Sequence, residues 1–136
     1  MSELPNIRQV LAKTKTIAVV GLSSNPAKPS HYVASYLQKH GYRIVPVNPN
    51  YAQVLGEICY PSLRQIPDEH KIDLVNIFRR SDAVPPIVEE AIHIGAKGIW
   101  MQEGVVHSAA AERARQAGLW VVMDRCLMVD HRNHVS

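Results

Sequence analysis

The stretch "GLSSNPAKPS", which begins at Gly21, places hydroxyl, amide and ammonium groups directly after an apolar run. Gly21 permits a tight turn. The hydroxyl, amide and backbone donors that follow it belong to Ser23, Ser24 and Asn25. Lys28 adds a mobile cation, and the amphipathic stretch after it would present the free N–H groups of a helix N-terminus. This combination predicts a phosphate site in a strand-to-helix loop, although the same residue types also form ordinary turns.

The loop departs from the glycine fingerprint of dinucleotide-binding proteins. That fingerprint reads G-x-G-x-x-G and is followed by an acidic residue at the end of the second strand, which binds the ribose hydroxyls. Here Gly21, Ser23 and Pro26 occupy the three glycine positions, and the second apolar run ends in "VNP" at 47–49. Because two glycines and the acid are missing, the sequence disfavours NAD and leaves an NAD(P)-dependent oxidoreductase as an alternative function.

Five short apolar runs must position this loop and its neighbours. Most of the runs are continuously apolar and rich in valine and isoleucine, which is typical of parallel strands covered by helices on both faces. The runs are "TIAVVG" (16–21), "YRIVPV" (42–47), "DLVNIF" (73–78), "KGIWM" (97–101) and "GLWVVM" (118–123). We therefore expect an α/β fold, a Rossmann-like, doubly wound, five-stranded parallel sheet with helices on both faces and the strand order 3-2-1-4-5.

The expected helices lie between these runs. One begins with Ser30 as its N-cap and ends at Gly41. Another begins with Ser81 as its N-cap and ends at Gly95. The remaining expectations are an alanine-rich helix from about residue 108 to 118 and a short leading helix within residues 3–13.

Two features fall outside this alternation. Pro46 has no N–H to donate, so we expect it at the last paired residue of its strand or at a bulge. The end of the chain reads as a polar tail in which His131 and His134 have H-x-x-H spacing, and we do not expect a metal there.

Composition limits the class of protein and its partners. A chain of 136 residues is expected to form one domain, and a hydrophobic content of 46% suits a globular protein. Neither an apolar leader nor a membrane-spanning run is visible, and Cys59 and Cys126 lack disulfide or metal spacing, so we expect reduced thiols in a cytoplasm. The net charge of +3 suits a small anionic ligand, and no basic block indicates nucleic acid.

The ordered set of strand ends resembles one family over nearly the whole chain. The stretches are "VVGLSSNPAKPS", "VPVNPNY", "DLVNIFRRSD", "AKGIWMQEGV" and "VVMDRC". They closely resemble the small stand-alone CoA-binding proteins, whose fold is similar to the CoA-binding domain of the succinyl-CoA synthetase α subunit. The resemblance covers roughly residues 5 to 131 and implies a single CoA-binding domain over 1–136. It implies that coenzyme A or an acyl-CoA binds at the carboxyl ends of the strands.

The resemblance also implies which residues line the CoA site. The first loop would hold the CoA phosphates, the second-strand loop would line the nucleotide end, and the later strand ends would flank the pantetheine arm. The implied residues are Gly21, Ser23, Ser24, Asn25, Pro26 and Lys28 in the first loop, Val47, Asn48 and Pro49 in the second, Phe78 and Arg79 at the end of the third run, and Met101, Gln102, Glu103 and Gly104 at the end of the fourth.

Cys126 follows the last run, and the thiol arm of CoA should approach it if the phosphates lie in the first loop. Arg125 beside it could favour the thiolate, the form that attacks a disulfide. We therefore hypothesise a mixed disulfide between Cys126 and bound CoA that Cys59 does not form. The alternative is that Cys126 is a small buried residue of the core.

The sequence shows no catalytic constellation. A ligase of the synthetase type needs a phosphorylated histidine on a second domain and a nucleotide-grasp domain, and neither fits in 136 residues. Spacing alone supports no Ser/His/Asp or Cys/His set. We therefore expect a binding domain without evident catalysis of its own, with an oxidoreductase or a protein-interaction domain with a vestigial nucleotide cleft as the alternatives.

Overall fold

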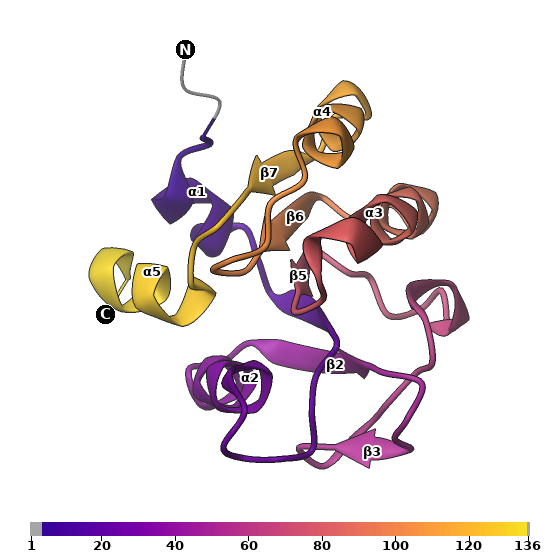
Figure 1. Ribbon diagram of the computed structural model, residues 1–136. Coiled ribbons are helices and arrows are strands. Elements are labelled where there is room, and N and C mark those ends of the chain that lie inside the picture. Colours follow the sequence, from indigo (N-terminus) through magenta and orange to yellow (C-terminus); the bar gives the residue numbers. More distant parts are fainter. Residues whose placement is uncertain (1–3, 136) are drawn as a thin grey trace.

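The five apolar runs form one parallel sheet, and the segments between them supply helices on both of its faces (Figure 1). The computed structural model describes residues 4–135. The strands of the sheet are β1 (Thr16–Val20), β2 (Arg43–Val47), β5 (Leu74–Ile77), β6 (Gly98–Met101) and β7 (Trp120–Val122). The other elements are α1 (Ile7–Ala12), α2 (Pro29–Lys39), α3 (Val84–His93), α4 (Ser108–Gln116), α5 (Leu127–His134), the hairpin β3 (Gln53–Val54) and β4 (Glu57–Ile58), and the 3-10 turns η1 (Leu63–Gln65) and η2 (Ser81–Ala83). The Rossmann-like α/β fold predicted from the sequence is confirmed.

The order of the strands differs from the predicted 3-2-1-4-5. The sheet reads β2-β1-β5-β6-β7, so the third long strand pairs with β1 instead of with β2. The outer edge of β2 is already occupied. The N–H of Tyr60 donates to the carbonyl of Pro46 at 3.0 Å, and the N–H of Asn48 donates to the carbonyl of Tyr60 at 2.9 Å. Because the segment that leaves β2 folds back over this edge, β5 pairs with the free edge of β1.

Pro46 lies inside β2, so the expectation of a strand end or a bulge is wrong. It pairs in register with Val19, one position before the last pair, Val20 with Val47. β2 is the edge strand of the sheet, and the carbonyl of Pro46 points outward to Tyr60. The missing N–H of proline therefore costs no hydrogen bond to β1.

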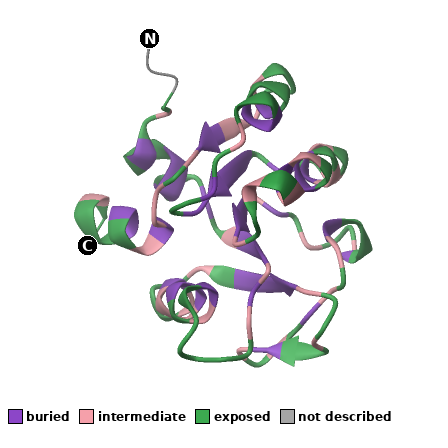
Figure 2. Ribbon diagram, in the orientation of Figure 1, coloured by how far each residue is buried: buried purple, intermediate pink, exposed green. Residues whose placement is uncertain are grey.

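Two apolar cores lie on opposite faces of the sheet (Figure 2). One lies under α1, α2 and α5, and the other lies under α3 and α4. Successive residues of a strand point to opposite cores. In β5, Leu74 belongs to the core under α1, α2 and α5, whereas Val75 and Ile77 belong to the core under α3 and α4. Burial on both faces explains why the strands read as continuous apolar runs.

The helices are short, and their starts differ slightly from the predicted ones. In the described part of the chain α2 is the longest, with 11 residues, and no helix there has the length and apolarity needed to cross a membrane. α2 begins at Pro29 with Lys28 as its N-cap, because proline suits the first helical position. Ser30 therefore lies inside the helix. Ser81 begins η2 instead of capping α3.

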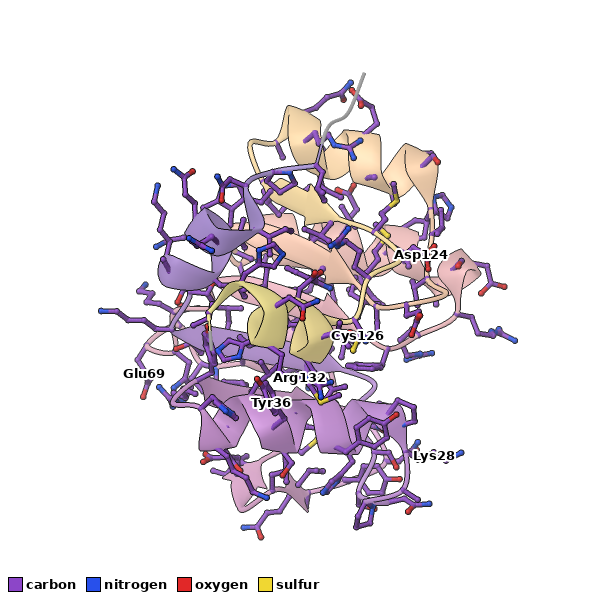
Figure 3. The ribbon with its side chains drawn as sticks, turned by 90° about the vertical axis from the view of Figure 1, so that its left-hand side faces the viewer. Lys28, Tyr36, Glu69, Asp124, Cys126 and Arg132 are labelled. Carbon is purple, nitrogen blue, oxygen red and sulfur yellow. The ribbon has the colours of Figure 1, made fainter. Side chains whose placement is uncertain are left out.

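Residues 127–134 form α5, so the expectation of a polar tail is wrong. Asp130 and His131 on this helix are each only 3% exposed. Asp130 accepts two hydrogen bonds from the guanidinium of Arg125, both at 2.7 Å, and Nδ1 of His131 lies 2.8 Å from the hydroxyl of Tyr36 on α2. Figure 3 shows α5 lying across α2, with Tyr36 on the side that faces α5. Polar side chains therefore hold α5 on its face of the sheet.

His131 predicts a specific pH dependence of stability. Burial lowers the pKa of His131 below its ordinary value, and the neighbouring His40 lowers it further. The unfolded state therefore takes up the proton first, so the stability contribution is complete above about pH 6.5 and is lost as the pH falls below that value. We expect the free energy of unfolding to decline from about pH 7 to about pH 5, by at most about 1.4 kcal/mol per pH unit.

Denaturant titrations at several pH values check this expectation on the wild type and on His131→Gln. Glutamine keeps a hydrogen-bonding group facing Tyr36 but does not titrate, so the variant should show a flatter profile above pH 5. An equally steep decline in the variant would assign the effect to another group.

Candidate functional site

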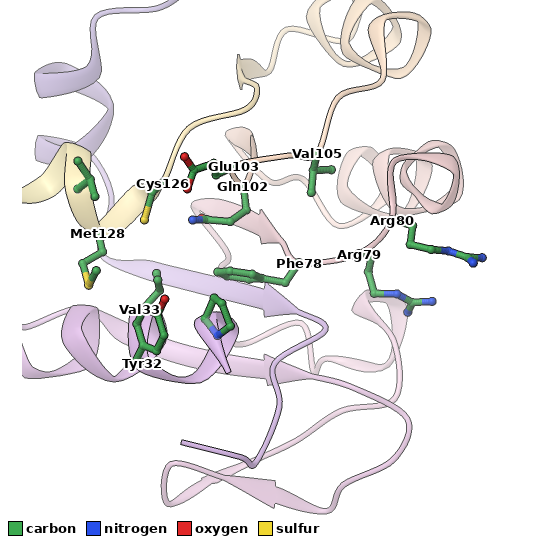
Figure 4. A pocket seen from close by; sticks show the side chains of 12 residues that line it. Tyr32, Val33, Phe78, Arg79, Arg80, Gln102, Glu103, Val105, Cys126 and Met128 are labelled. Carbon is green, nitrogen blue, oxygen red and sulfur yellow. The ribbon is translucent and has the colours of Figure 1, made fainter. Parts of the chain in front are cut away.

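A cleft of about 650 Å³ opens at the carboxyl ends of β5 and β6, between the starts of α2 and α5 (Figure 4). Its lining comes from α2 (Pro29, Tyr32, Val33), from the residues after β5 (Phe78, Arg79, Arg80), from the residues after β6 (Gln102, Glu103, Val105) and from the start of α5 (Cys126, Met128, Val129). β1 and β5 are neighbours, but the chain leaves β1 for α2 on one face and β5 for α3 on the other. Such a divergence creates a crevice that binds ligands in open α/β sheets.

The cleft has a charged end and an apolar end. Arg79 and Arg80 are exposed and extend from the segment after β5 (Figure 4). At the other end, Tyr32 and Val129 leave 46% and 40% of their surfaces exposed, beside the half-buried Met128. A cleft of this kind suits a ligand that carries anionic groups and a long arm of low polarity.

Gln102 is the buried polar residue of the cleft, with 5% of its surface exposed. Its side-chain oxygen accepts a hydrogen bond from the N–H of Leu127, the first residue of α5, at 3.4 Å. Among residues 4–135, no group accepts a hydrogen bond from its amide nitrogen. Figure 4 shows this side chain extending toward Cys126. A donor is therefore available to a ligand in the cleft.

The corner that leads into α5 is fixed by hydrogen bonds to the residues around β6. Asp124, which has a φ of 58°, accepts the N–H of Gly104 at 2.7 Å. The carbonyl of Arg125 accepts the indole N–H of Trp100 at 2.8 Å. The guanidinium of Arg125 is bound to Asp130, so it does not serve the neighbouring thiol as the sequence suggested. These contacts set the position of Cys126 at the cleft.

The loop after β1 is ordered by its own side chains. The N–H of Ser23 donates to the hydroxyl of Ser30 at 3.0 Å, which is why Ser30 is buried in the first turn of α2. The N–H of Asn25 donates to the hydroxyl of Ser23, and the N–H of Ala27 donates to the side-chain oxygen of Asn25, both at 3.0 Å. Lys28 is exposed at the N-cap of α2. The loop is thus a preformed surface at the positive end of a helix.

The loop after β2 packs against this first loop. The side-chain nitrogen of Asn48 donates to the carbonyl of Leu22 at 3.1 Å. Hydrogen bonding with the side chains of Ser24 and Ser23 lowers the pKa of the Tyr51 hydroxyl. The two loops therefore form one polar surface beside the cleft, and a ligand could contact both.

Gly21 is the point where three strand ends meet. Its N–H donates to the carbonyl of Val47 at 2.8 Å, and its φ is 88°. A Cβ at this position would overlap the backbone carbonyl of Phe78 and lie 3.1 Å from Cδ of Arg79. Only glycine allows this close approach, which brings the first loop next to the cleft.

Residues 15–132 of this chain match the family described as the CoA binding domain. The chain belongs to the CoA-binding domain family. It is 41% identical over 125 residues to the uncharacterized protein YneT of Bacillus subtilis (strain 168), a match that covers 92% of this chain and 91% of YneT. It is also 36% identical over 97 residues to the ADP-forming acetate–CoA ligase II of Archaeoglobus fulgidus, covering 70% of this chain but only 14% of the ligase.

Solved structures support the same fold for this CoA-binding domain. A hypothetical protein from Pyrococcus horikoshii OT3 is 39% identical and superposes with a TM-score of 0.92, covering 100% of this chain and 94% of that one. A dinucleotide-forming acetyl-coenzyme A synthetase 1 from Ca. Korarchaeum cryptofilum superposes with a TM-score of 0.71 over 81% of this chain and 26% of the synthetase. At 24% identity, that second likeness concerns the fold alone.

The predicted ligand residues of the CoA-binding domain fall into three groups. Those that line the cleft are Phe78, Arg79, Gln102, Glu103 and Cys126. Those in the two adjoining loops are Gly21, Ser23, Ser24, Asn25, Pro26, Lys28, Asn48 and Pro49. The side chains of Val47 and Met101 are buried in the core under α3 and α4, and the N–H of Gly104 is bound to Asp124. This last group, Val47, Met101 and Gly104, lies outside the cleft lining.

Several residues of the cleft were missed by sequence reasoning. Tyr32 and Val33 lie in the first turns of α2, and Met128 and Val129 lie in the helix that was taken for a tail. A signal existed in the first case, because side chains near the start of a helix after β1 lie near the carboxyl edge of the sheet. For Met128 and Val129 no local signal was available without the position of α5.

Proposed function

We propose that this domain binds coenzyme A or an acyl-CoA, with the diphosphate at the loop after β1 and the pantetheine arm in the cleft. The observation that carries the proposal is the position of the cleft, which lies where the chain leaves β1 and β5 for opposite faces of the sheet. The family match supports CoA as the ligand class.

The chemistry of the two parts of the site suits the two parts of CoA. The first loop offers Lys28 and the positive end of α2 to the phosphates. The cleft offers apolar side chains and the free amide of Gln102 to an arm that contains methylene groups and amides. Arg79 and Arg80 supply further positive charge. The proposal assigns binding and no catalysed reaction.

A thermal-shift panel of CoA, acetyl-CoA, dephospho-CoA, NAD, NADP and ATP tests the proposal. A ligand at about one hundred times its Kd stabilises the folded state by about 2.7 kcal/mol. We expect stabilisation by CoA and acetyl-CoA, and a smaller effect from dephospho-CoA, which lacks one phosphate. Stabilisation by NAD or NADP alone would favour an oxidoreductase, and no response to any compound would favour an interaction domain with a vestigial cleft.

The same panel on Lys28→Ala locates the phosphates. Loss of the ammonium should weaken CoA binding by about 1–3 kcal/mol, the range for a charge-assisted hydrogen bond. The loss should shrink at high salt because screening already weakens the contact. Lys39→Ala, at the other end of α2, is the matched control and should bind as the wild type does. Equal affinities of the two variants at low salt would remove Lys28 from the site.

A further inference from the structure

The two thiols of the chain have opposite surroundings. Cys59 is 6% exposed, its thiol donates to the carbonyl of Asn48 at 3.4 Å, and burial raises its pKa. Cys126 is a free thiol that lines the cleft. Its sulfur makes no capping hydrogen bond although Cys126 is the N-cap residue of α5. Of the two cysteines, only Cys126 is therefore presented to a ligand in the cleft.

Gln102 supplies a second, independent feature beside this thiol. Its side chain is buried, yet its amide nitrogen has no acceptor within residues 4–135 and lies toward Cys126 (Figure 4). Because Gln102 lines the cleft, this donor is open to an acceptor on a molecule bound there. The pantetheine arm carries an amide carbonyl a few atoms from its sulfur. A carbonyl bound by Gln102 would bring that sulfur close to Cys126.

Groups with opposite effects on charge lie near Cys126. The N-terminus of α5 favours negative charge on the sulfur, whereas Glu103, which lies near it in the cleft, opposes that charge (Figure 4). Arg125 contributes little because Asp130 already binds its guanidinium. The position of a bound partner is therefore the factor that we expect to make reaction at this thiol fast.

We propose that Cys126 exchanges with the disulfide of CoA and retains one CoA as a mixed disulfide in the cleft. This inference rests on the proposed function, since the nucleotide part of the ligand must bind first. The Cys126 thiolate attacks one sulfur of CoA disulfide, a new sulfur–sulfur bond forms, and the other CoA leaves as a thiolate that takes up a proton. The oxidant is CoA disulfide itself. A free thiol in excess reverses the step and releases CoA.

The test is intact mass spectrometry of the reduced protein after timed exposure to CoA disulfide or to glutathione disulfide at equal concentration. We expect an adduct with the mass of one CoA less two hydrogens on the wild type and on Cys59→Ser, and none on Cys126→Ser. The initial rate with CoA disulfide should exceed that with glutathione disulfide by about tenfold or more, because only CoA is positioned by the site. Desulfo-CoA in excess should slow the reaction, and dithiothreitol should remove the adduct.

Binding of reduced CoA to Cys126→Ser, measured by thermal shift, separates the two levels of the proposal. If this variant binds CoA but the wild type forms no adduct, the exchange reaction is refuted and the binding function stands. If neither protein binds CoA, the proposed function itself is refuted. An adduct on Cys59, or equal rates with the two disulfides, would also overturn the inference, because the cleft would then not direct the reaction.

Discussion

Gly21→Ala is expected to lower the free energy of unfolding by about 3–4 kcal/mol. The left-handed conformation at Gly21, with φ of 88°, alone costs an alanine about 1–2 kcal/mol. The added Cβ also overlaps the backbone carbonyl of Phe78, and a backbone atom cannot move aside as a flexible side chain can. Thermal denaturation should therefore show a midpoint lower by about 10–15 °C.

Gly41→Ala is the matched control for this prediction. Gly41 has a similar φ of 96°, but apart from Gly41 and its two chain neighbours no atom of residues 4–135 lies within 4 Å of the Cβ position. The free energy of unfolding of Gly41→Ala should therefore fall only by the conformational cost of about 1–2 kcal/mol. Gly21→Ala should also bind CoA more weakly, because the added Cβ pushes the end of β1 away from Phe78 and moves the first loop away from the cleft. Gly41→Ala should keep its affinity for CoA. Equal destabilisation of both variants would show that the close approach to Phe78 is relaxed at little cost.

The strands of this domain could be predicted because each is buried on both faces. Largely apolar runs such as 17–20 and 74–77 are typical of that environment, and the local sequence contains this information. The order of the strands, in contrast, could not be predicted from the strands alone. It depends on which edge of β1 or β2 is free when β5 forms, and the backbone of Tyr60 decides this by covering β2. No pattern within the strands themselves records that choice.

The helix α5 was missed because its buried positions carry polar residues. Leu127, Asp130 and His131 follow the helical spacing i, i+3 and i+4, which is the spacing of a buried face. Only the first of these three residues is apolar, so hydropathy indicates a tail. Burial becomes favourable through partners that are distant in sequence, such as Tyr36 for His131. The same omission concealed Met128 and Val129 at the apolar end of the cleft.

The candidate site was predictable where it follows strand ends and not where it depends on packing. Phe78, Gln102 and Cys126 line the cleft, and each lies at or just after the end of an apolar run. Met101 also ends a strand, but its side chain points to the opposite core, because alternate residues of a strand face opposite sides. Position in the sequence was enough to locate the edge at which the cleft opens, whereas the face to which each side chain points required the register.

Asp130→Asn is expected to destabilise the attachment of α5 by about 2–4 kcal/mol. The carboxylate of Asp130 is buried and accepts two charge-assisted hydrogen bonds from Arg125 at 2.7 Å. The amide of asparagine can accept only one of them and turns a donor toward the guanidinium, so the buried pair is broken. Because α5 carries Met128 and Val129 of the cleft, CoA binding should weaken as well.

The loss of stability in Asp130→Asn should be confined to α5 and should not extend to the whole domain. Among the helices, α5 packs mainly against α1 and α2, whereas β1 and β5 lie in the middle of the sheet. Hydrogen exchange should therefore become faster in the amides of α5 and stay nearly unchanged in β1 and β5. Asp82→Asn is the matched control, since the pair of Asp82 with Arg80 at 3.5 Å is almost fully exposed and is expected to contribute less than about 1 kcal/mol. Uniform acceleration across the sheet in Asp130→Asn would mean that α5 unfolds only with the whole domain, and the start of α5 would then be a rigid wall of the cleft.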